Sequence, residues 1–96
     1  MTLEELRTTR REEILHLAGE CGARNVRVFG SVARGESDAR SDIDFLVDLD
    51  PGRSLLDLGR LQRRLERLLA SKVDVVSSRG LRERVRLRIQ QDAVLL

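Results

Sequence analysis

Residues 26–50 read VRVFGSVARGESDARSDIDFLVDLD and hold two strand patterns separated by a turn-rich segment. The first pattern, residues 26–29, alternates and stops at Gly30, which predicts a short strand that runs into a turn. The second pattern, residues 43–49, predicts the clearest strand of the chain, because apolar and acidic side chains alternate between its two faces. The intervening residues 30–42 are rich in Gly, Ser, Asp and Arg, which indicates a functional loop that starts with a short helix.

Helical patterns and one more strand surround this segment. Apolar residues recur every three or four positions over residues 2–22, which predicts one amphipathic helix. Ser54 can cap another helix with a stripe of leucines, and a last helix runs from about Leu81 to near the C-terminus. The stripe consists of Leu58, Leu61, Leu65 and Leu68. With a third strand at residues 73–76, this order predicts a single α/β domain over residues 1–96, a two-layer sandwich with a small sheet.

The composition argues against several classes of protein. Hydrophobic residues make up 41% and charged residues 35% of the chain, which is the balance of a folded globular domain. The net charge is only +2 and the two phenylalanines are the only aromatic residues, so we do not expect direct nucleic-acid binding. One cysteine, an N-terminus without a signal-peptide pattern and no apolar run near the roughly 20 residues of a membrane span predict a cytoplasmic protein.

An acidic pair begins the second strand. Asp42 and Asp44 stand two positions apart, so both project from one face of a strand, with Cα atoms about 6.5–7 Å apart. Such a pair can share a cation, since Mg²⁺ commonly takes one or two carboxylates together with phosphate oxygens. Asp48 and Asp50 repeat the spacing, but Pro51 follows directly, so we interpret them as strand-end and turn residues.

The turn before the pair has the features of an anion site. Gly30 lets a phosphate approach the main chain without a Cβ in the way. Ser31 adds a hydroxyl donor at the start of a short helix, where unpaired N–H groups attract anions. A phosphate-binding turn followed by a metal-binding strand makes the two halves of a nucleoside-triphosphate site.

The spacing of these two halves carries a family resemblance. Gly30 and Ser31, ten further residues and then Asp42-x-Asp44 resemble the Gly-Ser-x10-Asp-x-Asp signature of the DNA-polymerase-β-like nucleotidyltransferases, and most closely their minimal nucleotidyltransferase (MNT) branch. The resemblance implies a small mixed sheet flanked by helices, a Gly-Ser turn that binds the triphosphate of ATP, and paired aspartates that hold two magnesium ions. It also implies a third metal-binding acid on a later strand, for which Asp74 is the matching position.

The same resemblance implies a reaction and a partner. An acceptor hydroxyl would attack the α-phosphorus of ATP and pyrophosphate would leave, with Asp42, Asp44 and Asp74 as catalytic residues. The usual partner in the minimal branch is a small helical HEPN-domain toxin, which implies transfer of AMP to a tyrosine of such a toxin and an antitoxin role. Two alternatives stay open: a binding module that neutralises its partner by contact alone, and a tailing enzyme for RNA ends.

Some assignments within this site also stay open. Arg34 can reach the phosphates as a bidentate donor, or it can pair with Glu36 or Asp38. Asp74 would bind the metal next to the acceptor and help remove its proton, with an exposed strand-end residue as the plain alternative. A chain of 96 residues has little room for an acceptor platform, so we expect a partner or a second copy to complete the site.

Other side chains are expected to have structural roles. Ser41 is predicted to cap or orient the loop before the second strand. The lone His16 is predicted to be structural or solvated, and Cys21 to be packing. Four arginines of the last predicted helix are interpreted as solvated, with contacts to a partner as the alternative: Arg82, Arg84, Arg86 and Arg88.

Overall fold

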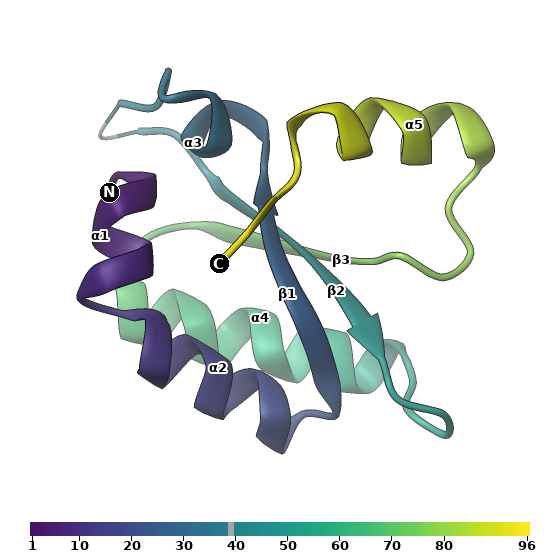
Figure 1. The fold of residues 1–96 in the computed structure, drawn as a ribbon. Coiled ribbons are helices and arrows are strands. Elements are labelled where there is room, and N and C mark those ends of the chain that lie inside the picture. Colours follow the sequence, from purple (N-terminus) through teal and green to yellow (C-terminus); the bar gives the residue numbers. More distant parts are fainter. Residues whose placement is uncertain (39) are drawn as a thin grey trace.

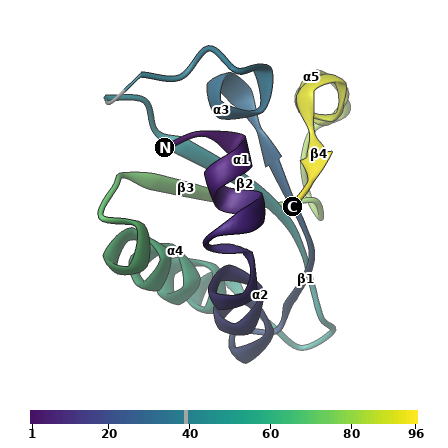
Figure 2. The same ribbon diagram turned by 60° about the vertical axis from the view of Figure 1, so that its left-hand side comes forward.

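The computed structural model describes residues 1–38 and 40–96, which form a four-stranded sheet flanked by helices (Figure 1). In chain order their elements are α1 (Leu3–Thr8), α2 (Arg11–Glu20), β1 (Ala23–Phe29), α3 (Gly30–Arg34), β2 (Ile43–Leu49), α4 (Leu55–Leu69), β3 (Val73–Ser77), α5 (Glu83–Asp92) and β4 (Val94–Leu95). Helices α2 and α4 lie along one face of the sheet, whereas α5 lies over the other face (Figure 1, Figure 2). The predicted α/β fold, a small sheet flanked by helices, is confirmed.

The sheet is mixed, with the strand order β3-β2-β1-β4. Strand β1 runs antiparallel to β2 and to β4, and β2 runs parallel to β3. The parallel pair is joined through α4, since parallel neighbours need a long crossover connection. Strand β1 begins at Ala23 rather than at the predicted Val26, and a bulge at Asn25, with φ of +52°, separates its two halves. The alternation that predicted the strand therefore starts only after the bulge.

An aliphatic core fills the space between the sheet, α2 and α4. Its centre includes the inward side chains of β2, as predicted from the alternation: Ile43, Phe45 and Val47. Leu46 points to the opposite face of the sheet but is only 2% exposed, and Ile89 of α5 is also buried. Both lie outside the main core, and α5 lies over this second face of the sheet (Figure 2).

Helix α4 carries the leucine stripe into the core. Its N-cap Ser54 accepts a hydrogen bond from the Leu56 N–H at its Oγ, and the Asp57 carboxylate accepts one from the Ser54 N–H at 2.9 Å. These bonds satisfy two N–H groups at the start of the helix. The predicted stripe is buried except at its end, where Leu69 is buried in the core and Leu68 packs against it only partly buried, because a step of four residues leads to position 69.

The prediction of one helix over residues 2–22 was wrong, because two helices occupy this segment. The first ends before Thr9 and the second begins after Arg10. The break falls between Leu6 and Ile14, which are both fully buried, in a stretch of only polar residues. No apolar side chain there holds the intervening turn against the core.

The predicted last helix is confirmed as α5, although it begins two residues after Leu81 and does not reach Ala93. Helix α5 ends at Asp92, and β4 then pairs with β1. The Arg7 guanidinium donates two hydrogen bonds to the Leu95 carbonyl, at 3.0 and 2.7 Å. These pairings with distant segments draw the final residues into the sheet, and no local pattern reveals them.

Candidate active site

The register of the sheet brings the Gly-Ser turn and two of the predicted acids together. In the antiparallel β1-β2 pair, Phe29 lies opposite Asp44, so the turn after Phe29 starts beside Asp44. In the parallel β2-β3 pair, Asp44 lies opposite Asp74. Neighbouring strands run about 4.8 Å apart, so the two aspartates are adjacent on the sheet. Asp42 is exposed and directly precedes β2.

Gly30 lies against the side chain of Asp44. Its φ of +75° falls in the left-handed region, and a Cβ at this position would collide with Oδ2 of Asp44. Only glycine meets both conditions without strain. Ser31 follows as the second residue of α3 and is half-buried, while the N-cap residue Phe29 has no side-chain group that could accept a hydrogen bond from the first turn.

The charged form of Asp44 is disfavoured by its surroundings. Partial burial and then the charges of Asp74 and Asp42 raise the pKa of Asp44 above its ordinary value, while Arg34 acts in the opposite direction. The charges of Asp74 and Asp42 therefore both act on Asp44. Repulsion among partly desolvated carboxylates is the situation that a bound cation relieves, and perturbed pKa values of this kind are common at functional sites.

The acids fit a magnesium site that phosphates help to complete. Within residues 1–38 and 40–96, no three acidic, histidine or cysteine side chains converge closely enough to hold an ion by themselves. Magnesium in nucleotide sites usually takes one or two carboxylates and obtains its other ligands from phosphates and water. Carboxylate oxygens suit magnesium as ligands. Here they lie next to a glycine turn without a Cβ, where phosphate oxygens can approach the main chain.

The loop ahead of the acids is closed by hydrogen bonds around Asp38. Ser41 Oγ accepts a bond from the Asp38 N–H at 2.9 Å and donates one to Asp38 Oδ1 at 3.2 Å. The Arg40 N–H donates to the same Oδ1 at 2.8 Å. The predicted role of Ser41 in orienting this loop is confirmed.

Two carboxylates hold the guanidinium of Arg34, the last residue of α3. Nε donates to Glu36 Oε2 at 2.9 Å and Nη1 donates to Asp92 Oδ2 at 2.7 Å, and both bonds raise the pKa of Arg34. Pairing with Glu36 was one predicted alternative and is confirmed, whereas Asp38 bonds within its own loop instead. Asp92 was missed because it lies 58 positions along the chain and no local spacing relates the two residues.

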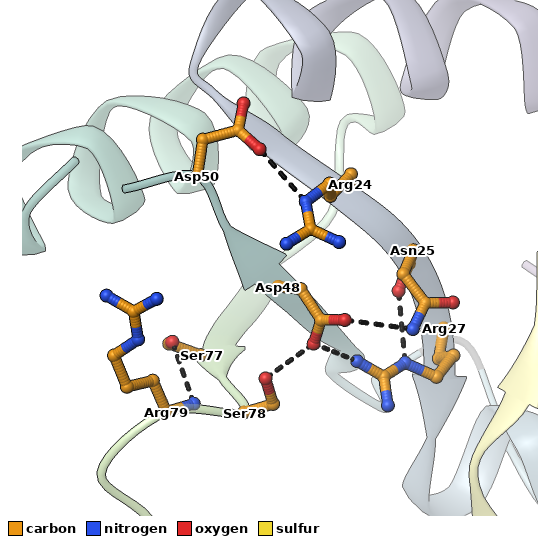
Figure 3. A network of polar contacts seen from close by, with 8 residues as sticks. All are labelled: Arg24, Asn25, Arg27, Asp48, Asp50, Ser77, Ser78 and Arg79. Atoms are coloured by element: carbon orange, nitrogen blue, oxygen red, sulfur yellow. Dashed lines mark hydrogen bonds and ion pairs between the residues drawn. The ribbon is translucent and has the colours of Figure 1, made fainter. Parts of the chain in front are cut away.

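The second acidic pair lies toward the other end of β2 and forms structural contacts (Figure 3). Asp48 accepts hydrogen bonds from Arg27 Nη2 at 2.6 Å and from Asn25 Nδ2 at 3.0 Å. Ser78 Oγ donates to the same carboxylate, and Asp50 pairs with an arginine of β1. Although partial burial opposes it, these bonds hold the pKa of Asp48 below its ordinary value. The interpretation of this pair as strand-end and turn residues is confirmed.

The remaining candidates have the structural surroundings expected of them. Cys21 is fully buried in the core. The His16 side chain is exposed, and its Nε2 lies 3.3 Å from Glu20 Oε1 on the same helix. Four arginines at and within α5 are exposed, as predicted: Arg82, Arg84, Arg86 and Arg88.

Comparison with known proteins identifies the class that this fold and site define. The sequence profile of the nucleotidyltransferase domain matches residues 9–95, so the chain belongs to the nucleotidyltransferase domain family and is an enzyme of that class. A Methanocaldococcus jannaschii protein, named as a candidate protein adenylyltransferase, is 38% identical over 84 residues, which cover 88% of this chain and 90% of the relative. Protein adenylyltransferase MntA of Thermococcus cleftensis is 35% identical over 94 residues, covering 98% of this chain and 95% of the relative.

Solved structures agree with this assignment. One described as a candidate minimal nucleotidyltransferase is 52% identical, has a TM-score of 0.86 and covers 100% of this chain and 97% of its own, which confirms the resemblance to that branch. A toxin-antitoxin structure with AMP-PNP, 22% identical with a TM-score of 0.77, covers 88% of this chain and 69% of its own. A complex of tri-AMPylated Shewanella oneidensis HEPN toxin with MNT antitoxin is 19% identical with a TM-score of 0.72. The match covers 93% of this chain and 70% of the other chain. The last two similarities show the fold alone.

Proposed function

We propose that this chain transfers AMP from ATP, with magnesium, to a tyrosine hydroxyl of a partner HEPN-type toxin and so acts as its antitoxin. The observation that carries the proposal is the position of Asp44, which lies between the Gly30 turn on one side and Asp74 on the other. Two relatives that cover most of this chain are named for protein adenylyl transfer, and this supports AMP as the group transferred.

The Gly-Ser turn would bind the triphosphate. Without a Cβ at Gly30, a phosphate oxygen can approach the main-chain N–H groups at the start of α3, and Ser31 Oγ can donate a further hydrogen bond. Asp42 and Asp44 would hold two magnesium ions at the edge of this turn. Bound magnesium supplies positive charge to the phosphate and acceptor oxygens during the transfer.

Asp74 would act on the acceptor side of the site. It neighbours Asp44 across the parallel pair and is exposed, so an incoming hydroxyl can reach it from solvent. Its carboxylate would help to bind metal and would accept the proton of the attacking hydroxyl, while pyrophosphate leaves from the α-phosphorus. If Asp74 is only an exposed strand residue, its substitution should not change the transfer of AMP.

The acceptor would come from another molecule. Solved structures with the same fold include complexes of an MNT antitoxin with an AMPylated HEPN toxin, which supports a toxin as the class of partner. A binding module without catalysis is the second candidate, because contact alone can neutralise a toxin. We also propose that the protein acts in the cytoplasm and without direct nucleic-acid binding. In the described part of the chain, no helix is both long and apolar enough to cross a membrane.

A transfer assay tests the proposal. The chain is co-expressed with a HEPN-domain protein, and the purified pair is incubated with magnesium and ATP labelled at the α-phosphate. We expect label to enter the partner with the wild type and to be lost with Asp42→Ala or Asp44→Ala. Asp48→Asn is the matched control, because Asp48 is on the same strand but is bonded to Arg27 and Asn25.

Two outcomes would contradict the proposal. If the wild type transfers nothing and the alanine variants still neutralise the partner, the chain is a binding module. If the Asp42→Ala, Asp44→Ala double variant keeps full transfer, the assignment of these acids to the metal is wrong.

A further inference from the structure

Arg34 is held from two sides by segments that are far apart in the chain. Glu36 lies two residues after it, in the loop that leaves α3, while Asp92 is the last residue of α5. Helices α3 and α5 lie next to each other above the sheet in both views (Figure 1, Figure 2). The Asp92 contact is thus a charged link between the C-terminal helix and the helix that begins with Gly30.

Arg34 also lies within electrostatic range of the candidate site. It is one turn along the short helix that starts at the Gly-Ser turn, and its charge acts on Asp44. Its positive charge therefore favours the binding of a triphosphate at the turn. Arginine suits that task because its planar fork can donate two parallel hydrogen bonds to a phosphate.

The two carboxylates leave part of the guanidinium available. Arginine has five N–H donors, and the bonds to Glu36 and Asp92 use Nε and Nη1. Among the residues that the structure describes, Nη2 has no hydrogen-bond partner, so its two N–H groups and one of Nη1 remain for a ligand. Because the bonds to Glu36 and Asp92 fix the plane of the guanidinium, they also fix the direction in which the remaining N–H groups point.

We infer that Asp92 is a positioning residue that orients Arg34 toward the triphosphate, so that α5 is part of the nucleotide site. This inference rests on the proposed function, since it requires a triphosphate at the Gly-Ser turn. A free arginine side chain loses much rotamer freedom when it binds a phosphate, and a side chain that is already held loses less. Asp92 therefore strengthens binding of the triphosphate without touching it.

Asp92 is better suited to this role than Glu36. The Asp92 side chain is 27% exposed and its bond to Arg34 is 2.7 Å, whereas the Glu36 side chain is 65% exposed and its bond is 2.9 Å. A more shielded pair is screened less by water and salt, so it restrains the arginine more strongly. Glu36 therefore offers a matched control with the same partner and a weaker expected effect.

Calorimetric titration with magnesium and AMP-PNP tests the inference. We expect Asp92→Asn, which keeps the shape but removes the charge, to weaken AMP-PNP binding about 5- to 10-fold, equivalent to about 1–1.4 kcal/mol. Binding of AMP, which lacks the β- and γ-phosphates, should change less than twofold. Glu36→Gln should have a smaller effect on AMP-PNP, and Asp92→Glu should restore part of the affinity.

A double-variant cycle separates positioning from a structural role. In an Arg34→Ala background, Asp92→Asn should cause no further loss of AMP-PNP affinity, because its effect passes through the arginine. Thermal unfolding of each variant checks that the chain is folded. Unchanged AMP-PNP affinity in folded Asp92→Asn would overturn the inference, and so would tighter binding, which would make Asp92 a competitor of the phosphates. If the wild type does not bind AMP-PNP at all, the proposed function fails and the inference fails with it.

Discussion

Asp44 combines the features that a metal-binding acid needs and that a stable strand avoids. Its carboxylate lies beside Gly30, opposite Asp74 and close to Asp42, and its pKa is raised first by partial burial and then by these two charges. Ionisation of Asp44 therefore lowers the free energy of unfolding of the chain. We attribute this loss of stability to function, because a cation bound among the acids removes it.

Substitution of Asp44 should consequently stabilise the chain while it removes activity. An acid whose pKa is higher in the folded state lowers stability as the pH rises above its unfolded pKa of about 3.9. We expect Asp44→Asn, without magnesium, to unfold at a higher temperature than the wild type at pH 7. The difference should shrink as the pH falls through the raised pKa of Asp44 and vanish below about pH 3.9. Thermal unfolding followed by circular dichroism across this pH range measures it.

Asp48→Asn is the matched control with the opposite sign. Asp48 lies on the same strand, but hydrogen bonds from Ser78, Asn25 and Arg27 outweigh its partial burial and keep its pKa low. Its contribution to stability is present at neutral pH and is lost on acidification through its lowered pKa. The variant should therefore unfold at a lower temperature than the wild type at pH 7. Equal shifts of both variants in one direction would contradict this reading of the two acids.

The residues of the site differ in how far the sequence predicts them. Gly30, Ser31, Asp42 and Asp44 stand within fifteen consecutive residues, so their spacing is visible in the chain. Their metal and nucleotide roles stay predictions. Asp92 could not be predicted, because its contact with Arg34 depends on where α5 packs.

The edge of the sheet that carries Asp74 is closed by α4. Strand β3 is an edge strand, and the N–H groups that it directs outward need acceptors. Gln62 Oε1 accepts from the Val75 N–H at 3.2 Å, and Glu66 Oε2 accepts from the Val73 N–H at 3.3 Å. These bonds flank Asp74 on both sides and attach the strand to α4.

Removal of one of these acceptors should weaken the edge. We expect Gln62→Ala to lower the free energy of unfolding by about 1 kcal/mol, because the partly buried Val75 N–H loses its partner. Gln62→Glu keeps an oxygen acceptor in the same place and should retain most of the stability. Denaturant unfolding of the two variants measures the difference. If Gln62→Glu is as unstable as Gln62→Ala, the hydrogen bond is not the cause.

Elements with a strong local pattern were predicted well, and the others were not. The alternation of β2 and the leucines of α4 identify both elements, because one face of each is buried in the main core. The break between α1 and α2 was missed, because a helical period continues across the polar gap. Strand β4 was missed because only two residues pair with β1 and nothing in their own sequence requires it.

The candidate site draws on segments that meet only in the fold. Strand β1 contributes the turn, β2 and β3 contribute the acids, and α5 contributes the partner of Arg34 (Figure 1). The general fold followed from the order of helices and strands, because alternating elements favour a sheet covered by helices. The position of α5 over the second face did not, since it depends on a few contacts such as the burial of Leu46 and Ile89.

We propose that the acids beside the Gly-Ser turn bind the triphosphate through magnesium. Calorimetric titration of the wild-type chain with ATP, in magnesium and again in excess EDTA, tests this role of the acids. We expect binding in magnesium to weaken at least about 10-fold, or about 1.4 kcal/mol, both on removal of the metal and in the Asp42→Ala, Asp44→Ala double variant. The double variant should also become insensitive to EDTA. Equal affinity for ATP in all of these conditions would show that the acids do not bind the triphosphate through magnesium.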